Sequence, residues 1–151
     1  LQHEKACYHN FRFDGALLHY GCYSLSWLPS AYVMCKSTIS LNLEHMNHFR
    51  DAFLPEATEN ALRDPKVSPI FADLQELRGK LPPALFTCGT EDCLLDDTLL
   101  MSVKWLAAGA ESRLEIIPGA PHGYIAFPRN VAGSGSEQGM VAVDRFILEH
   151  L

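Results

Sequence analysis

The sequence predicts an α/β fold, with about three parallel strands flanked by helices. Three short apolar runs, at residues 13–21, 84–88 and 113–117, have the length and composition of buried strands. Segments with helical periodicity separate them, at residues 24–63 and 97–108. Strands that alternate with helices form a parallel sheet with crossover connections.

Local sequence signals delimit each predicted strand. The first run, FDGALLHYG, ends at a glycine; the second, ALFTC, follows two prolines and precedes Gly89; the third, RLEII, leads into a Pro-Gly loop. Three strands are few, because a sheet typically has about five or six. We therefore expect this chain to form one side of a larger sheet whose missing strands lie upstream.

Periodic apolar residues predict the helices. One amphipathic helix ends at Pro55 and is marked by Ile39, Leu43, Met46, Phe49 and Phe53. A second helix spans residues 97–108, with Asp96 or Asp97 as its cap. The apolar face expected for it consists of Leu99, Leu100, Val103 and Leu106. A final helix is predicted over residues 138–151.

Charge and hydropathy exclude several kinds of partner. The net charge of −6 and the pI near 5.6 leave no basic surface for nucleic acid or anionic membranes. No apolar run approaches the ~20 residues that span a bilayer. Charge and hydropathy do not exclude small neutral ligands.

The cysteine and histidine patterns predict neither a disulfide framework nor a metal site. The five cysteines are an odd set without CxxC spacing, which favours reduced thiols and a cytoplasmic location. His45 and His48 share a helix face, but no third ligand is evident, so we expect a solvated face.

Two ionisable residues directly follow the second and third predicted strands. Asp92 comes after the second strand and His122 after the third. The carboxyl ends of parallel strands meet at one edge of a sheet, and neighbouring strands stand about 4.8 Å apart. We therefore expect the carboxylate and the imidazole to meet there. Simpler roles remain open, as a turn residue for Asp92 and a carbonyl-bonded histidine for His122.

Two segments carry a resemblance to a known family. LPPALFTCGTEDCLLDD and AAGAESRLEIIPGAPHGY resemble the acid and histidine segments of hormone-sensitive-lipase-like esterases, a branch of the α/β-hydrolase superfamily. The preceding SPIFADLQELRGKLPP is also similar, and a looser likeness extends from Phe13 to the C-terminus. The resemblance implies hydrolysis of carboxylic esters of small or hydrophobic acyl groups without a metal or organic cofactor, with Asp92 as triad acid and His122 as general base.

The resemblance also divides the chain. It implies that residues 1–151 are a partial α/β-hydrolase domain, with a cap-like helical insertion at 24–63 and a core at 84–151 that carries the acid and histidine loops. Candidates for a substrate pocket in the insertion are Trp27, Met34, Met46, Phe49 and Phe53. The alternative is that these side chains are only core.

The nucleophile of this chemistry is absent from the sequence. No serine lies in a G-x-S-x-G motif, and Ser134 and Ser136 follow the histidine, in the wrong order for an α/β-hydrolase. The HGGG-type oxyanion loop is also absent. We expect the chain to be the C-terminal half of a serine esterase and to be inactive alone. The alternative is a short, non-catalytic protein that binds a partner through its exposed sheet edge.

Overall fold

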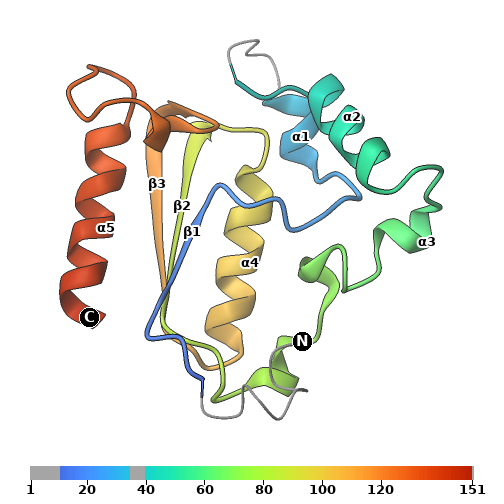
Figure 1. Cartoon of the computed structure of the whole chain (residues 1–151), viewed down its shortest axis with the longest axis horizontal. Helices are drawn as coiled ribbons and strands as arrows, with labels where there is room; N and C mark the ends of the chain where they lie inside the picture. The colour runs from blue at the N-terminus through green and yellow to red at the C-terminus, as the bar shows by residue number, and fades with distance from the viewer. Residues whose placement is uncertain (1–10, 35–39, 151) are drawn as a thin grey trace.

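Within the part of the chain that the structure describes, three parallel strands form a central sheet (Figure 1). The computed structural model describes residues 11–34 and 40–150. The strands are β1 (Ala16–His19), β2 (Ala84–Glu91) and β3 (Ser112–Pro121), in the order β1-β2-β3. The predicted parallel α/β fold is confirmed, although β1 is shorter and β3 longer than the sequence indicated.

Helices connect and cover the strands. The α-helices of the described residues are α1 (Pro29–Val33), α2 (Leu43–Phe53), α3 (Glu59–Leu62), α4 (Leu95–Ala107) and α5 (Ser136–His150). Short 3-10 turns occur at Pro69–Phe71, Leu74–Leu77 and Tyr124–Ala126. Helices α1 to α3 all lie between β1 and β2 in the chain, whereas α4 alone links β2 to β3.

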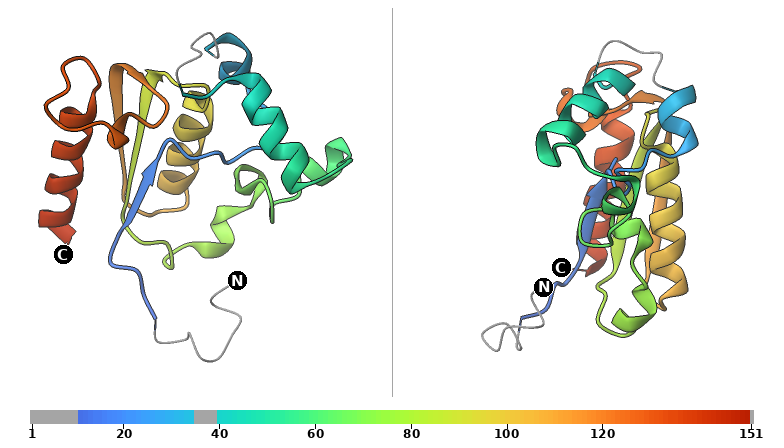
Figure 2. Two further views of the ribbon diagram at one scale, coloured as in Figure 1. Left: turned by 45° about the horizontal axis from the view of Figure 1, so that its top comes forward. Right: turned by 90° about the vertical axis from the view of Figure 1, so that its right-hand side faces the viewer.

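Strand β2 is the centre of the core because it is covered on both faces. Phe86 packs with Met101 of α4, while the next residue toward the N-terminus, Leu85, packs with Phe146 of α5. Successive side chains of a strand point to opposite faces, so β2 contributes side chains to the core on the α4 side and to the core on the α5 side. The right-hand view of Figure 2 shows the sheet between these two helices.

Helix α4 turns a different face to the core than its apolar pattern predicted. Its buried residues are Asp97, Thr98, Met101 and Ser102, whereas Leu100, Val103 and Leu106 are about half exposed or more. The predicted cap is also wrong, since Leu94 is the N-cap residue and makes no side-chain cap bond. The Asp97 carboxylate accepts backbone N–H groups from the segment after β1. This contact holds Asp97 on the inner face of the helix.

Helix α2 matches the predicted amphipathic helix. The Asn42 side chain caps it by accepting the His45 N–H at 2.9 Å, and the helix ends at Phe53, two residues before Pro55. Ile39, assigned to the same pattern, lies outside the described residues. Only Met46 of α2 is buried. The helix lies to the β1 side of the sheet, near the carboxyl ends of the strands (Figure 1).

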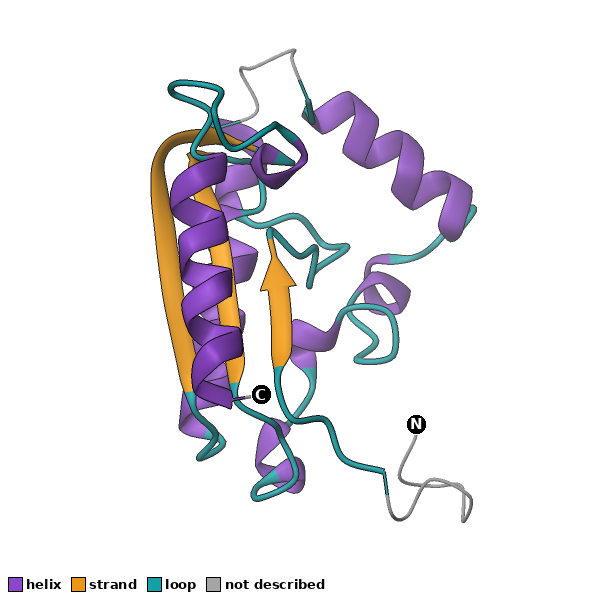
Figure 3. Cartoon of the chain, turned by 60° about the vertical axis from the view of Figure 1, so that its left-hand side comes forward, coloured by secondary structure: helices purple, strands orange, loops and turns teal. Residues whose placement is uncertain are grey.

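Strand β1 lies at one edge of the sheet. It pairs in parallel with β2 from Ala16 to His19, and no other strand of the described residues pairs with its outer side. Figure 3 shows β1 as the outer strand of the sheet. A further strand would have free backbone groups to pair with here.

Strands β2 and β3 approach each other most closely at a glycine. A Cβ atom added to Gly89 would lie 1.9 Å from the carbonyl oxygen of Ala120. The strand register shifts between Gly89 and Glu91, directly before Asp92. Only a residue without a side chain allows β3 to come this near to the end of β2.

We therefore expect Gly89→Ala to reduce the free energy of unfolding by about 3 kcal/mol, because the new methyl group must separate the two strands. Gly119→Ala is the matched control. Gly119 has a φ of +73° but open space around its Cα, so only backbone strain applies and the loss should be about 1 kcal/mol. Urea denaturation measures both, and equal losses would contradict the close approach.

Candidate active site

Asp92 directly follows β2 and is fully buried. Its Oδ1 accepts the backbone N–H of Leu94 at 2.9 Å, which folds the loop back toward the start of α4. A buried carboxylate is costly unless hydrogen bonds or an opposite charge compensate for the lost water. The Leu94 amide supplies one hydrogen bond to the Asp92 carboxylate, and both carboxylate oxygens also face a histidine.

His122 directly follows β3 and makes the expected contact. Its Nδ1 lies 3.0 Å from Oδ2 and 3.2 Å from Oδ1 of Asp92. The next residue, Gly123, has a φ of +76°, which turns the chain sharply after the imidazole. The sheet thus brings together the two residues that the strand ends singled out. Their catalytic roles stay predictions.

The contact with Asp92 determines how the imidazole is presented. A carboxylate can only accept, so Nδ1 of His122 carries the proton in this pair. Nε2 is left as the nitrogen that can exchange a proton with another group. The His122 side chain is 25% exposed, whereas that of Asp92 is fully enclosed. This is the orientation that a general base requires.

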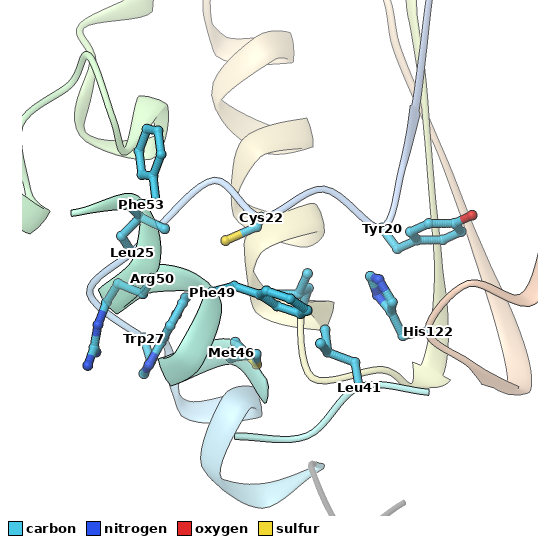
Figure 4. A pocket seen from close by; sticks show the side chains of 11 residues that line it. Tyr20, Cys22, Leu25, Trp27, Leu41, Met46, Phe49, Arg50, Phe53 and His122 are labelled. Atoms are coloured by element: carbon cyan, nitrogen blue, oxygen red, sulfur yellow. The ribbon is translucent and has the colours of Figure 1, made fainter. Parts of the chain in front are cut away.

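His122 forms part of the wall of a cavity of about 470 Å³ (Figure 4). Four of the five residues predicted for a substrate pocket also line it: Trp27, Met46, Phe49 and Phe53. Figure 4 shows the Phe49 ring extending from α2 toward His122. Phe49 and Phe53 are more than 60% exposed, so the cavity opens to solvent beside α2.

Met34 is the predicted pocket residue that the cavity does not include. It is the C-cap residue of α1, whose amide bonds the Ser30 carbonyl. Sequence reasoning also missed several lining residues: Tyr20, Cys22, Leu25, Leu41, Arg50 and Leu94. Tyr20 and Leu94 could have been found, since one follows β1 and the other lies two residues after Asp92. Leu41 carries no sequence signal.

Contacts between α2 and the segment before α1 hold the cavity wall together. The Trp27 indole donates to Oδ1 of Asn47 at 2.7 Å, and the Arg50 guanidinium lies 5.4 Å from the centre of the Trp27 ring. Met46 is buried against Ala31 of α1. The aromatic wall therefore depends on a few side-chain contacts with α2.

The comparison with protein families agrees with the geometry. A family model described as the alpha/beta hydrolase fold matches residues 5–126, which is most of the chain. The chain belongs to the α/β-hydrolase family. The resemblance noted in the sequence is thereby confirmed. No curated protein sequence matches the chain.

Solved structures similar to this chain include esterases. An esterase/lipase from an uncultured bacterium is 26% identical with a TM-score of 0.72, covering 91% of this chain and 43% of its own. The carboxylesterase EstE1, cloned from a metagenomic library, is 26% identical with a TM-score of 0.73, covering 91% and 46%. EstE5, in a crystal soaked with p-nitrophenyl butyrate, is 25% identical with a TM-score of 0.76, covering 96% and 46%. The chain spans less than half the length of each.

Two adjacent carboxylates tie α4 to the segment that follows β1. Oδ1 of Asp97 accepts the N–H groups of Tyr23 and Ser24, both at 2.7 Å. Oδ2 of Asp96 accepts the N–H of Ser30 at 2.8 Å. The Ser30 hydroxyl in turn donates to the carbonyl of Cys93, the residue after Asp92. The loop that carries Asp92 and the start of α1 are therefore held together by hydrogen bonds.

The cysteines near the site differ in their chemical state. Burial, followed by the charge of Asp97, raises the pKa of Cys22 to about 12, and burial raises the pKa of Cys88 further. Both thiols are free and neutral at pH 7. Cys93 is disulfide-bonded, so the expectation of a reduced thiol there is wrong. The cytoplasmic location stays a prediction.

The described part of the chain holds no group of three or more His, Cys, Asp or Glu side chains placed to bind a metal ion. None of the helices within residues 11–34 and 40–150 is long and apolar enough to cross a membrane.

Asp97 gives a prediction about pH. Burial raises its pKa to about 6, with the Asp96 charge adding to the shift and the two backbone N–H bonds opposing it. An unfolded aspartate has a pKa near 3.9, so the folded chain holds this proton more tightly. The resulting stabilisation is complete below about pH 4 and is lost as the pH rises through 6, by on the order of 3 kcal/mol.

Asp97→Asn keeps an acceptor oxygen but does not ionise. The free energy of unfolding of this variant, relative to the unaltered chain, should therefore rise by about 2–3 kcal/mol between pH 4 and pH 7.5. Urea denaturation at a series of pH values measures this difference. A difference that stays constant with pH would contradict the account.

Proposed function

We propose that this chain supplies the acid and the general base of a serine carboxylic-ester hydrolase. Asp92 is the acid and His122 the base. The observation that carries the proposal is the hydrogen bond between His122 Nδ1 and the fully buried Asp92 carboxylate, at the wall of an apolar cavity. The esterase neighbours support the same reaction class.

In the proposed reaction the proton moves through Nε2 of His122. Nε2 takes the proton of a serine hydroxyl as that oxygen attacks the ester carbonyl carbon, and Asp92 stabilises the resulting imidazolium. The imidazolium then gives the proton to the departing alkoxide, leaving an acyl-serine. Water repeats the sequence, with Nε2 again accepting and returning a proton, and the acid is released.

The serine and the oxyanion donors would come from a G-x-S-x-G elbow and an HGGG-type loop, neither of which occurs in this sequence. The 151 residues alone should therefore be inactive. The open edge of β1 is where the strand that carries such elements could pair.

The substrate side of the proposal rests on the cavity. We assign residues 24–63 to a cap-like insertion and the cavity to the acyl group of the ester. Its lining is mostly apolar, with Trp27, Met46, Phe49 and Phe53 as the large side chains. Such a lining favours small neutral acyl groups over charged ones.

The direct test is hydrolysis of p-nitrophenyl acetate and butyrate. The 151-residue chain and a form extended upstream to include a G-x-S-x-G motif are compared. We expect activity only in the extended form. His122→Ala should lower its kcat by about 10⁴- to 10⁶-fold and Asp92→Asn by about 10⁴-fold, because the serine is then not activated.

Hydrolysis by the short chain that disappears with His122→Ala would reveal another nucleophile and contradict the division of roles. If no upstream sequence with the motif exists, the chain is instead a non-catalytic binding protein that uses its sheet edge.

The acyl assignment makes a separate prediction for the extended form. Phe49→Ala should lower kcat/KM for the butyrate ester about tenfold and for the acetate ester less than threefold, since only the longer acyl group reaches the ring. Phe13→Ala is the control, because Phe13 is also exposed but does not line the cavity. Equal losses for both esters would place the acyl group elsewhere.

A further inference from the structure

Tyr20 has an unusual backbone conformation at the carboxyl end of β1. Its φ is +37°, a left-handed value that residues with side chains rarely adopt. Its amide donates to the Thr87 carbonyl at 2.7 Å, so the pairing of β1 with β2 continues into this residue. Strained residues persist only where surrounding contacts hold them, and they concentrate at functional sites.

The ring of Tyr20 lies between His122 and a fixed buried ring. Its centre is 4.7 Å from that of the His122 imidazole, with the planes 63° apart, and 5.7 Å from the centre of the Tyr124 ring. Tyr124 is fully buried, and its hydroxyl donates to Oγ1 of Thr87 at 2.6 Å. On the side away from His122, the Tyr20 ring therefore packs against a side chain that burial and a hydrogen bond hold in place.

The hydroxyl of Tyr20 has no comparable role. It has no hydrogen-bond partner among the described residues, and Figure 4 shows it pointing away from His122. Burial, followed by the charge of Asp92, raises the pKa of Tyr20, so the hydroxyl stays protonated at pH 7. Any effect on His122 must come from the ring.

The bonds to Asp92 leave the imidazole incompletely fixed. They hold Nδ1, but the ring can still tilt about that point or turn over, and no other polar group of the described residues bonds His122. A second contact, on the ring itself, is needed to fix its plane. Tyr20 makes such a contact.

We propose that Tyr20 is a positioning residue whose ring holds the His122 imidazole with Nδ1 on Asp92 and Nε2 toward the cavity. The importance of this position for ester hydrolysis rests on the proposed function, whereas the effect on the imidazole does not. The strained backbone of Tyr20 serves to direct the ring over His122 instead of along the sheet edge.

The test is ¹⁵N NMR of the His122 side chain in the 151-residue chain, with the signal assigned by its loss in His122→Ala. Tyr20→Leu keeps the apolar bulk and the backbone strain but removes the ring, while Tyr20→Phe keeps the ring and removes the hydroxyl. We expect Tyr20→Leu to raise the fraction of imidazole that carries its proton on Nε2 by about threefold to tenfold. Tyr20→Phe should match the unaltered chain.

An unchanged His122 spectrum in a folded Tyr20→Leu variant would overturn the proposal, as would a Tyr20→Phe variant that behaves like Tyr20→Leu. The unaltered chain provides a check that needs no variant. Nuclear Overhauser contacts between the Tyr20 ring and the His122 ring protons are expected, and their absence would also overturn the proposal.

The proposed esterase function and the positioning role of Tyr20 can be tested independently, because different outcomes contradict each of them. If the extended form hydrolyses no ester but the spectra change as expected, the proposed function is wrong and the positioning role stands. If the extended form is an esterase whose kcat and His122 spectrum are the same in Tyr20→Leu, the positioning role is wrong and the function stands.

Discussion

The parallel pairing of β2 with β3 is the constraint on which the site depends. Cys88 and Gly89 pair with Ile116 and Ile117, so both strands run toward the same edge of the sheet. Gly89 then lets the end of β3 approach closely enough for His122 to reach Asp92. Residues 30 positions apart become hydrogen-bonded because two strands end together. A shift of one residue in this register would separate them.

Two buried carboxylates follow β2, and their partners give them different roles. Asp97 is bound by two backbone amides and joins α4 to the segment after β1. Asp92 is bound by one backbone amide and by an imidazole that reaches the cavity. The first arrangement anchors the loop, and the second leaves a group that can transfer protons. The anchoring of α4 also affects the Asp92 loop. Ser30, which is bonded to α4 through Asp96, donates to the carbonyl of Cys93, the residue after Asp92.

Much of this architecture follows from local sequence. The buried strand β2 and the helix α2 were predicted because their patterns need no knowledge of the rest of the chain. The meeting of Asp92 and His122 was predicted because strand ends in a parallel sheet share an edge.

The remaining features depend on tertiary contacts that no periodicity encodes. The apolar pattern of α4 indicated a buried Leu100 and Val103, but the amides that bind Asp97 come from a segment more than 70 positions away. Met34 was predicted as a pocket residue from its place in the cap-like insertion, yet it ends α1 outside the cavity. The position of Tyr20 after β1 can be read from the sequence, but its left-handed backbone and its ring contact with His122 cannot, because both depend on the folded chain.

The central claim is that the carboxyl edge of the sheet places His122 so that its Nδ1–H donates a hydrogen bond to the Asp92 carboxylate. The most direct measurement is a ¹H NMR spectrum of the 151-residue chain from mildly acidic to neutral pH, searched for the Nδ1 proton of His122. The account predicts a resonance far downfield of the amide region that disappears in both Asp92→Asn and His122→Ala. A spectrum without this resonance, or one in which it survives Asp92→Asn, would contradict the account.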